Sequence, residues 1–422
     1  MKKKIFTLAL AGVLALTAFG GCTGGGDDSE KSYVVPTYED DKEITIGVWN
    51  GSFIYLKDQH IADLADAGIN LLVGHYDVTT EFLDNCAAHN VSVIPDERSW
   101  NGGTPSYYSH SAIKGLCVSD EPTAGEFDSL SQKHTLWKQT MGDKLFYVNL
   151  FPSYANSGAL GGSLDSYVSG FINKVRPDVL SYDYYAIQKD PDNSEVNRLR
   201  DTYFSDIDVY SHYAKQANIP LWYSVQTAGH QTYASPTTEE LRWQMAVAMT
   251  YGSKALLHYV YSSHESGYDP MVNMQGEKLP VFDRVKTADL EILAWDHIYM
   301  SFDWLGTTSV LGSKNEENWM FTLLQYELPL EDVNGVSDVT SDEDVLLGSF
   351  EDEDGNKGFM LTNASNPSEK KEANVNVTFS SQYKGVLVID DGEESVIALK
   401  NGVANIKLDA GEGKFLIPLK TK

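Results

Sequence analysis

Residues 235–263 read SPTTEELRWQMAVAMTYGSKALLHYVYSS, a helical pattern followed directly by an apolar strand. Ser235 is a candidate N-cap, Pro236 fits the first helical position, and acidic residues occupy the first turn, as is typical of a helix start. Gly252 is placed to end the helix. The run that begins at Lys254 is almost continuously hydrophobic, which is typical of a parallel strand covered on both faces. This stretch therefore predicts one helix–strand unit of an α/β fold.

The same unit recurs along the chain from Glu43 onward. Apolar runs of strand length begin at Ile44, Asn70, Val91, Gly115, Lys144, Asp178, Pro220 and Lys254. Helical patterns such as HIADLADAGI and TTEFLDNCAAHN fill the intervals. Eight such units over about 250 residues match the size of a (β/α)8 TIM barrel. An open, doubly wound sheet is the alternative, and the number of units favours a closed barrel over residues 43–303.

A different pattern begins near Trp304. Segments such as ANVNVTFSS and GVANIKL alternate hydrophobic and polar residues, and Asp-Gly and Asn-Gly pairs separate them. This is typical of antiparallel strands joined by hairpins. We expect a small all-β sandwich domain over residues 304–422, with an acidic, irregular connection from Glu316 to Thr340.

The N-terminus has the pattern of an export signal. Lys2–Lys4 are basic, Ile5–Phe19 are apolar, and two glycines precede Cys22, which is the order of regions in a secretory signal peptide. The small residues before the cysteine resemble the lipobox of bacterial lipoproteins. That resemblance implies a signal peptide over 1–22, a lipidated Cys22 that anchors the protein outside the cell membrane, and a flexible tether over 23–42. An ordinary cleaved signal peptide is the alternative.

Composition excludes some functions. The chain has 32 Lys and Arg against 60 Asp and Glu, a formal net charge of -28, so its surface repels polyphosphate and nucleic acid. Cys86 and Cys117 lie in predicted elements and are expected to be small core residues. The sequence contains no CxxC, HExxH, phosphate-loop or calcium-loop motif, so no metal or cofactor is expected.

Active sites of barrel enzymes lie at the carboxyl ends of the strands, so the polar residues that end each apolar run are site candidates. Acids, amides and aromatics dominate this set, and Lys and Arg are absent from it. Such residues suit a neutral polyhydroxylated ligand, because carboxylates and amides bond hydroxyls and aromatic faces cover sugar C–H groups. The candidate substrate-binding residues are Trp49, His75, Tyr76, Asn149, Tyr182, Tyr184, Gln226 and Tyr261. For Trp49 a core position at the rim is the alternative, and His75, Tyr76 and Asn149 could equally hold loops in place.

The fourth strand ends in the most informative motif, GLCVSDEP from Gly115. Asp120 and Glu121 are adjacent, so their side chains point to different sides of an extended backbone, and Pro122 stops the strand. A partly desolvated carboxyl beside another acid has a raised pKa. A glycosidase needs such a pKa in the acid that protonates the leaving oxygen. The alternative is an acid pair that caps the following helix or pairs with a neighbouring strand.

GLCVSDEP, YVNLFPSYA, VRPDVLSYDYYA and PLWYSVQ together resemble the barrel of bacterial glycoside hydrolases related to the family 42 β-galactosidases of clan A. The resemblance spans residues 43–263, and a β-sandwich after the barrel is also usual there. It implies a carbohydrate substrate and a general acid/base glutamate at the end of the fourth strand, a role that falls on Glu121. The residue before that glutamate is usually Asn in the clan, whereas this chain has Asp120.

The seventh strand departs from the clan. Gln226 stands where the nucleophilic glutamate is expected, and an amide is a poor nucleophile. The YDY of residues 182–184 is similar to family 18 chitinases, and the adjacent Asp-Glu is similar to family 20 hexosaminidases. Both families use the substrate's 2-acetamido group in place of a protein nucleophile. Alternatively, Asp183 is the second carboxylate, with a separation of about 5 Å for retention or about 6.5–9.5 Å for inversion.

We therefore expect a glycoside hydrolase that acts on an extracellular oligo- or polysaccharide. Glu121 is the expected general acid/base, and Asp183 and Asp120 compete for the second catalytic role. The alternative is a glycan-binding surface lipoprotein without catalysis, which Gln226 favours.

Overall fold

The computed structural model describes residues 32–51, 56–99 and 106–422. The expected signal peptide and the lipidation site Cys22 lie outside these residues. Residues Tyr33–Lys422 form one compact unit. Within the described ranges, no helix combines the length and the apolar character needed to cross a bilayer.

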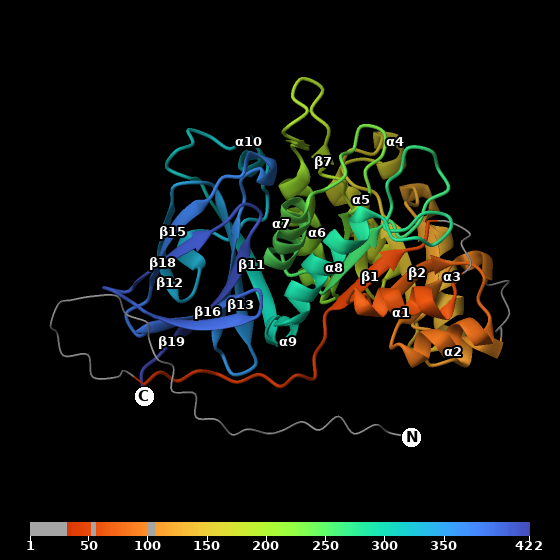
Figure 1. The fold of residues 1–422 in the computed structure, drawn as a ribbon, viewed down its shortest axis with the longest axis horizontal. Coiled ribbons are helices and arrows are strands. Elements are labelled where there is room, and N and C mark those ends of the chain that lie inside the picture. Colours follow the sequence, from red (N-terminus) through yellow and green to blue (C-terminus); the bar gives the residue numbers. More distant parts are fainter. Residues whose placement is uncertain (1–31, 52–55, 100–105) are drawn as a thin grey trace. The chain divides into compact units, whose positions relative to one another are not determined.

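Eight parallel strands form a barrel, with helices packed around them (Figure 1). The strands are β1 (Thr45–Trp49), β2 (Leu71–His75), β3 (Ser92–Pro95), β4 (Gly115–Asp120), β5 (Leu145–Leu150), β6 (Leu180–Asp183), β9 (Leu221–Gln226) and β10 (Ala255–Tyr259). Their order is β3-β2-β1-β10-β9-β6-β5-β4. The two end strands meet through parallel bridges from Val93 to Ile113 and from Asp96 to Cys117, so the sheet closes on itself. The TIM-barrel prediction is confirmed, and each strand begins within two residues of its expected start.

Helices on the outside of the barrel follow the strands in sequence. They are α1 (Asp58–Asp66), α2 (Thr80–Ala88), α3 (Phe127–Met141), α4 (Ser157–Leu160), α5 (Leu164–Val175), α6 (Tyr203–Ala217), α7 (Thr238–Thr250), α8 (Pro280–Leu293) and α9 (Asp296–Tyr299). The expected cap of α7 is wrong by two residues. Thr237 is the N-cap and accepts from Glu240 N, while Ser235 Oγ instead accepts from Arg284. Thr237 is preferred because Glu240 reaches back to it, completing a capping box.

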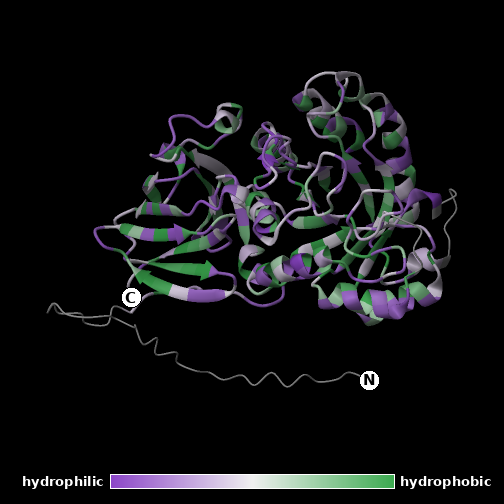
Figure 2. Ribbon diagram, turned by 45° about the horizontal axis from the view of Figure 1, so that its top comes forward, coloured by the Kyte–Doolittle hydropathy of each residue, from purple (hydrophilic) through white to green (hydrophobic). Residues whose placement is uncertain are grey.

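Two apolar layers hold the barrel together. The inner layer fills the barrel with residues such as Leu71, Tyr147, Trp222 and Leu257. The outer layer packs the strands against the helices, and the hydrophobic residues that form it run along the strands in green in Figure 2. Cys86 belongs to the outer layer, and Cys117 belongs to the inner one. Both are buried free thiols, as expected.

Antiparallel sheets follow the barrel, as the sequence predicted. One sheet has the order β11 (Phe302–Val310), β13 (Val345–Asp352), β14 (Lys357–Asn363), β19 (Gly413–Leu419), β16 (Gly385–Asp390), β17 (Glu393–Ala398). The other contains β12 (Val336–Ser341), β15 (Ala373–Phe379) and β18 (Val403–Leu408). Buried Val, Leu and Phe side chains fill the space between them. The boundary near residue 304 stays a prediction, because the barrel and the sandwich belong to the same compact unit.

The connection from Glu316 to Thr340 is more regular than expected. It contains helix α10 (Trp319–Thr322), a 3-10 turn (Leu330–Asp332) and most of β12. Asp208 of α6 accepts from Gln325 N and Tyr326 N at 2.8 Å each, which ties the connection to the barrel. The composition of the segment did not predict this regular structure, because it depends on long-range contacts to α6.

A smaller element belongs to the carboxyl end of the barrel. The connection between β6 and α6 forms a short hairpin of β7 (Ile187–Gln188) and β8 (Arg198–Leu199). It stands at the upper edge of Figure 1, at the same end of the barrel as α4. These connections surround the mouth, where the polar ends of the strands converge.

Candidate active site

Asp120, Asn149 and Asp183 end or nearly end the neighbouring strands β4, β5 and β6, and their side chains meet at the barrel mouth. Asn149 Nδ2 donates to Asp120 Oδ1 at 3.1 Å and to Asp183 Oδ1 at 2.7 Å. Because both oxygens bond the same nitrogen, they are at most about 5.8 Å apart, the two lengths taken end to end. One amide therefore holds two carboxyl groups close together.

The orientation of this amide is set from inside the barrel. Ser181 Oγ donates to Asn149 Oδ1 at 3.3 Å, and the Tyr147 hydroxyl lies 2.8 Å from Ser181 Oγ. Burial raises the pKa of Tyr147 well above its usual value, so its hydroxyl keeps its proton. Since the amide oxygen has a donor below it, the amide nitrogen faces the two acids.

Glu121 follows Asp120 and is half-buried. Its φ is 50°, in the left-handed region that costs a residue with a Cβ about 1–2 kcal/mol. Glu121 N donates to Asn149 O at 2.8 Å, and the Tyr167 hydroxyl donates to Pro122 O at 2.6 Å. Hydrogen bonds to β5 and to α5 therefore hold the turn at Glu121 in place. Strain of this kind, maintained by surrounding contacts, concentrates at functional sites.

The pKa values of all three carboxyls are raised, chiefly by burial. Burial first, and then the charges of Asp183 and Asp120, raise the pKa of Glu121 to about 8. Burial and the Asp120 charge raise the pKa of Asp183 to about 7, against hydrogen bonds from Asn149 and Tyr185. Asp120 is accessible to water, yet the protein atoms crowded around it still raise its pKa by desolvation, and the Asn149 bond opposes this. Glu121, with its pKa raised to about 8, is therefore suited to hold a proton at neutral pH.

His75 is a structural residue in this arrangement. It is buried, its ring stacks on Phe82 at 4.3 Å, and burial lowers its pKa to about 4. Its Nδ1 lies 2.9 Å from Asn50 Nδ2, and Asn50 Oδ1 accepts from Ser262 Oγ at 3.2 Å. A neutral His75 accepts the Asn50 bond, so the pair fixes the ends of β1 and β2.

A cation stands near the end of β3, although Lys and Arg are absent from the residues that end the strands. Arg98 lies in the 3-10 turn Glu97–Ser99, with its guanidinium 3.6 Å from the centre of the Tyr76 ring. Its Nε also donates to Asp96 Oδ1 at 2.7 Å. One face of Tyr76 is therefore covered, and Asp96 neutralises the charge. Arg98 was missed because it stands three residues after the strand rather than at its end.

Trp49 ends β1, and both interpretations of it, a sugar platform and a core residue at the rim, stay predictions. It is half-buried and packs on Tyr147 of the inner layer at 5.8 Å between ring centroids.

Tyr182, Tyr184 and Tyr261 lie away from the carboxyl cluster. Tyr182 stacks on Tyr210 of α6 at 3.8 Å, and the Tyr184 hydroxyl bonds Thr202 Oγ1 at 2.7 Å. Tyr261 is buried in the outer layer. Tyr182 and Tyr184 point away from the mouth because side chains alternate along a strand. Since Asp183 faces the mouth, its two neighbours face the helices.

Gln226 is fully engaged with backbone groups. Its Oε1 accepts from Ile187 N at 2.8 Å, and its Nε2 donates to Ile187 O at 2.8 Å and to Ala234 O at 2.9 Å. A glutamate could not make the two donor bonds. The glutamine on the seventh strand therefore joins two mouth loops and is unavailable as a nucleophile.

An aromatic wall that was not among the predicted site residues stands beside the acids. Tyr185 packs on Tyr259 at 5.4 Å and on Tyr233 at 5.6 Å between ring centroids, and His230 stacks on Tyr268 at 4.3 Å. Tyr185, Tyr233, Tyr259 and Tyr268 are each partly exposed. The alternation that turns residues 182 and 184 outward was the available signal, because it places residue 185 on the same side as Asp183.

The opposite end of the barrel has a different character. A cavity of about 510 Å³ there is lined by residues that include Glu43, Lys114 and Trp222, with no comparable cluster of acids. Among the described residues, no group of three or more His, Cys, Asp and Glu side chains is arranged to hold a metal ion.

Comparisons with known proteins give structural matches only. No family model and no curated protein sequence matches the chain. Among solved structures, the chain is similar to a putative α-galactosidase from Bacteroides fragilis, with a TM-score of 0.49, 9% identity, and coverage of 90% of this chain and 80% of that one. It is similar to the endo-β-1,4-mannanase from Thermotoga petrophila, with a TM-score of 0.39, 11% identity, and coverage of 90% and 98%.

A β-galactosidase from the psychrophilic Marinomonas ef1 matches with a TM-score of 0.44 and 10% identity. That match covers 61% of this chain and 62% of the β-galactosidase, so the chain spans less than two thirds of that enzyme. These three solved structures are named as glycoside hydrolases or a putative one, and the fold assignment itself follows from the strand order described above.

Proposed function

We propose that this protein is a glycoside hydrolase that acts on a neutral oligo- or polysaccharide. The observation that carries the proposal is the group of Asp120, Glu121 and Asp183 at the barrel mouth, with pKa values of about 8 for Glu121 and about 7 for Asp183. Hydrolysis of a glycosidic bond needs one carboxyl that holds a proton at working pH and one that is ionised beside it. The aromatic wall supplies faces for the sugar ring.

Glu121 is the proposed general acid/base. Its carboxyl keeps a proton at neutral pH and delivers it to the glycosidic oxygen as the bond to the anomeric carbon breaks. Asp183 is the proposed second carboxylate, because Asn149 and Tyr185 both stabilise its ionised form. As a nucleophile it would form a glycosyl ester, which water cleaves with Glu121 acting as base.

Asp120 is the alternative for the second role, and the geometry limits how it acts. The Asp120 and Asp183 oxygens are at most about 5.8 Å apart, whereas inversion needs about 6.5–9.5 Å to admit a water. These two aspartates are therefore close for the acid and base of an inverting reaction, which fits Glu121 as the acid whichever aspartate takes the second role. A substrate-assisted reaction would leave Asp120 or Asp183 to orient a 2-acetamido group.

The test replaces Glu121 with Gln and follows release of reducing ends from a panel of plain hexosides, 2-acetamido glycosides and neutral polysaccharides. We expect the variant to lose hydrolysis and to keep binding nearly intact. Glu195→Gln, the same change at an exposed residue of the mouth-side hairpin, is the matched control and should keep full turnover. Unchanged turnover in Glu121→Gln would contradict the assignment.

A second candidate is a glycan-binding protein without catalysis, and the engagement of Gln226 favours it. In that case calorimetry on the unmodified chain would show glycan binding, with no reducing ends released after long incubation. Hydrolysis of any member of the panel, abolished in Glu121→Gln, would exclude it.

We also propose that Cys22 is lipidated and holds the protein on the outside of the cell membrane. The basic and apolar regions before Cys22 support this. In cells that express the full chain, Cys22→Ser should move the protein from the membrane fraction to the soluble fraction. Membrane association that survives this change would contradict the proposal.

A further inference from the structure

Trp319 is the most exposed of the large hydrophobic side chains that the structure describes, with 59% of its surface accessible. It is the first residue of α10. The next two residues, Met320 and Phe321, pack against the core, and the Phe321 ring lies 5.7 Å from that of Phe204 in α6. The helix is therefore docked through one side while the indole faces water.

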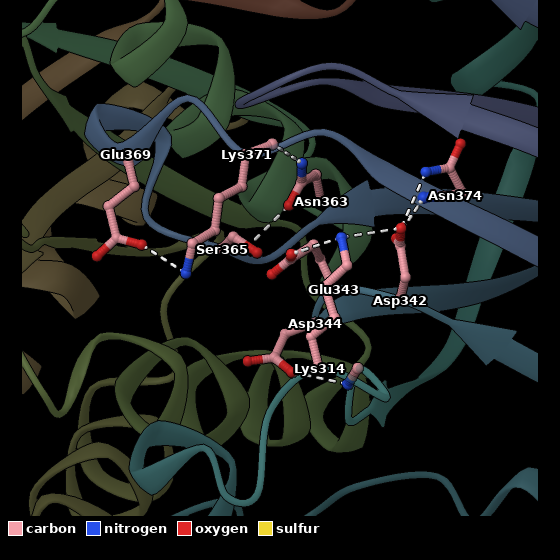
Figure 3. Close-up of polar contacts among 10 residues, drawn as sticks. Lys314, Asp342, Glu343, Asp344, Asn363, Ser365, Glu369, Lys371 and Asn374 are labelled. Carbon is pink, nitrogen blue, oxygen red and sulfur yellow. Dashed lines mark hydrogen bonds and ion pairs between the residues drawn. The ribbon is translucent and has the colours of Figure 1, made fainter.

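A polar clamp fixes the start of this helix. Asn318 caps α10 by accepting from Met320 N at 2.9 Å, and its Nδ2 donates to Asp344 Oδ2 at 2.8 Å. Asp344 is 6% exposed, and its Oδ1 accepts from Gly312 N at 2.8 Å. Asp344 lies in the turn between β12 and β13, and Figure 3 shows it near Lys314. Because the clamp holds the backbone, binding a ligand to the indole would order little of the chain and lose little entropy.

The Trp319 segment lies on the same side of the molecule as the barrel mouth. Phe204 is in the first turn of α6, which begins after the mouth hairpin β7–β8. Asp344 O accepts from Ala364 N at 2.9 Å, and nearby Asn366 Nδ2 donates at 2.7 Å to Asn197 O in that hairpin. Figure 1 draws α10 and β7 at the same edge of the barrel and sandwich. A long ligand that leaves the mouth on this side therefore passes toward Trp319.

The charges around Trp319 indicate the kind of ligand. Glu316 and Glu317, just before the helix, are exposed. Lys314 is paired with Asp342 and Glu343 at 3.1 Å each. Such surroundings repel anionic polysaccharides and anionic lipid headgroups, and they leave a neutral ring with apolar C–H faces as the suitable partner for the indole.

We propose that Trp319 is a second binding platform, outside the mouth, for the distal part of a neutral polysaccharide chain. The inference rests on the proposed glycosidase function and deepens it, because it makes the substrate a polymer rather than a short oligosaccharide. The platform adds affinity through effective concentration, since a chain held in the mouth presents its distal sugars to Trp319.

The test measures binding alone, in the Glu121→Gln background, by affinity electrophoresis through gels that contain soluble galactomannan, xyloglucan or dextran. Trp319→Ala should raise the dissociation constant for the bound polymer about five- to tenfold, the loss of one aromatic stacking contact. Leu311→Ala is the matched control, at an apolar residue directly after β11 that is 44% exposed, and should leave the constant unchanged. Asn318→Ala keeps the indole but removes the clamp, and should weaken binding by a smaller factor.

Equal retardation of the Glu121→Gln chain with and without Trp319→Ala would overturn the inference, as would the absence of retardation by all three polymers. Loss of binding to vesicles of phosphatidylcholine and phosphatidylglycerol in Trp319→Ala would also overturn it, by assigning the indole to a membrane. Failure of the glycosidase proposal is distinguishable. A protein that binds polymer through Trp319 but hydrolyses no glycan would contradict only the catalytic role of Glu121. The binding role of Trp319 would stand.

Discussion

Replacing Glu121 with Gln should change how the stability of the protein depends on pH. The pKa of Glu121 is about 8 in the folded protein against 4.5 for the ordinary group. The folded state therefore holds the proton more tightly than the unfolded state, so stability falls as pH rises from about 4.5 to about 8. Glutamine has no proton to lose, and the variant lacks this part of the decline.

The magnitude follows from the pKa difference. The interval between 4.5 and about 8 corresponds to at most about 5 kcal/mol. Glu121 is only half-buried and shares its titration with Asp183, so solvent screening reduces the expected effect to about 1–3 kcal/mol. Between pH 5 and pH 9, the gain in unfolding free energy of Glu121→Gln over the unmodified protein should grow by that amount.

The assay is urea-induced unfolding, followed by tryptophan fluorescence at pH 5, 7 and 9. Glu195→Gln, at an exposed acid, should follow the unmodified protein at every pH. A difference between Glu121→Gln and the unmodified protein that stays constant from pH 5 to pH 9 would refute the reasoning, because it would mean that Glu121 is ionised throughout.

Three other changes test the surrounding structure. Asn149→Ala removes a hydrogen bond that lowers the pKa of Asp183, so the acid limb of the pH–rate profile should move to higher pH. An acid limb that does not move would show that Asn149 has no influence on the ionisation of the catalytic acids. Gln226→Glu should destabilise by about 2–4 kcal/mol in urea unfolding, because the carboxylate cannot donate to Ile187 O and Ala234 O, and a neutral result would contradict those bonds. Tyr182→Phe should leave hydrolysis unchanged, and the free energy of unfolding should be equal or up to about 1 kcal/mol higher, since the buried Tyr182 hydroxyl has no partner among the described residues. A loss of hydrolysis would place Tyr182 in the active site.

The barrel was predictable because its signals are local. Each strand is a short apolar run, and each helix start carries its own capping residues, so the eight units could be found one at a time. The error at Ser235 shows the limit of such signals. Ser235 was the predicted cap, but Thr237 stands two residues later and caps the helix, because Glu240 reaches back to it.

The site was predictable only where strand position determined side-chain direction. Asp120, Glu121, Asn149 and Asp183 end consecutive strands, and the structure brings them together. Tyr182 and Tyr184 were also predicted as site residues, although the alternation of a strand turns them outward. Gln226 was read as a lost nucleophile, and its role in joining two loops depends on Ile187 and Ala234, which no local pattern connects to it.

The pH dependence of kcat/KM on a hydrolysed glycan tests the central claim most directly. We expect a narrow, bell-shaped curve of kcat/KM against pH, in which the carboxyl cluster titrates with apparent pKa values near 7 and 8. The rate rises as Asp183 ionises and falls as Glu121 loses its proton. A rate that stays constant from pH 7 to beyond pH 9 would contradict Glu121 as the proton donor.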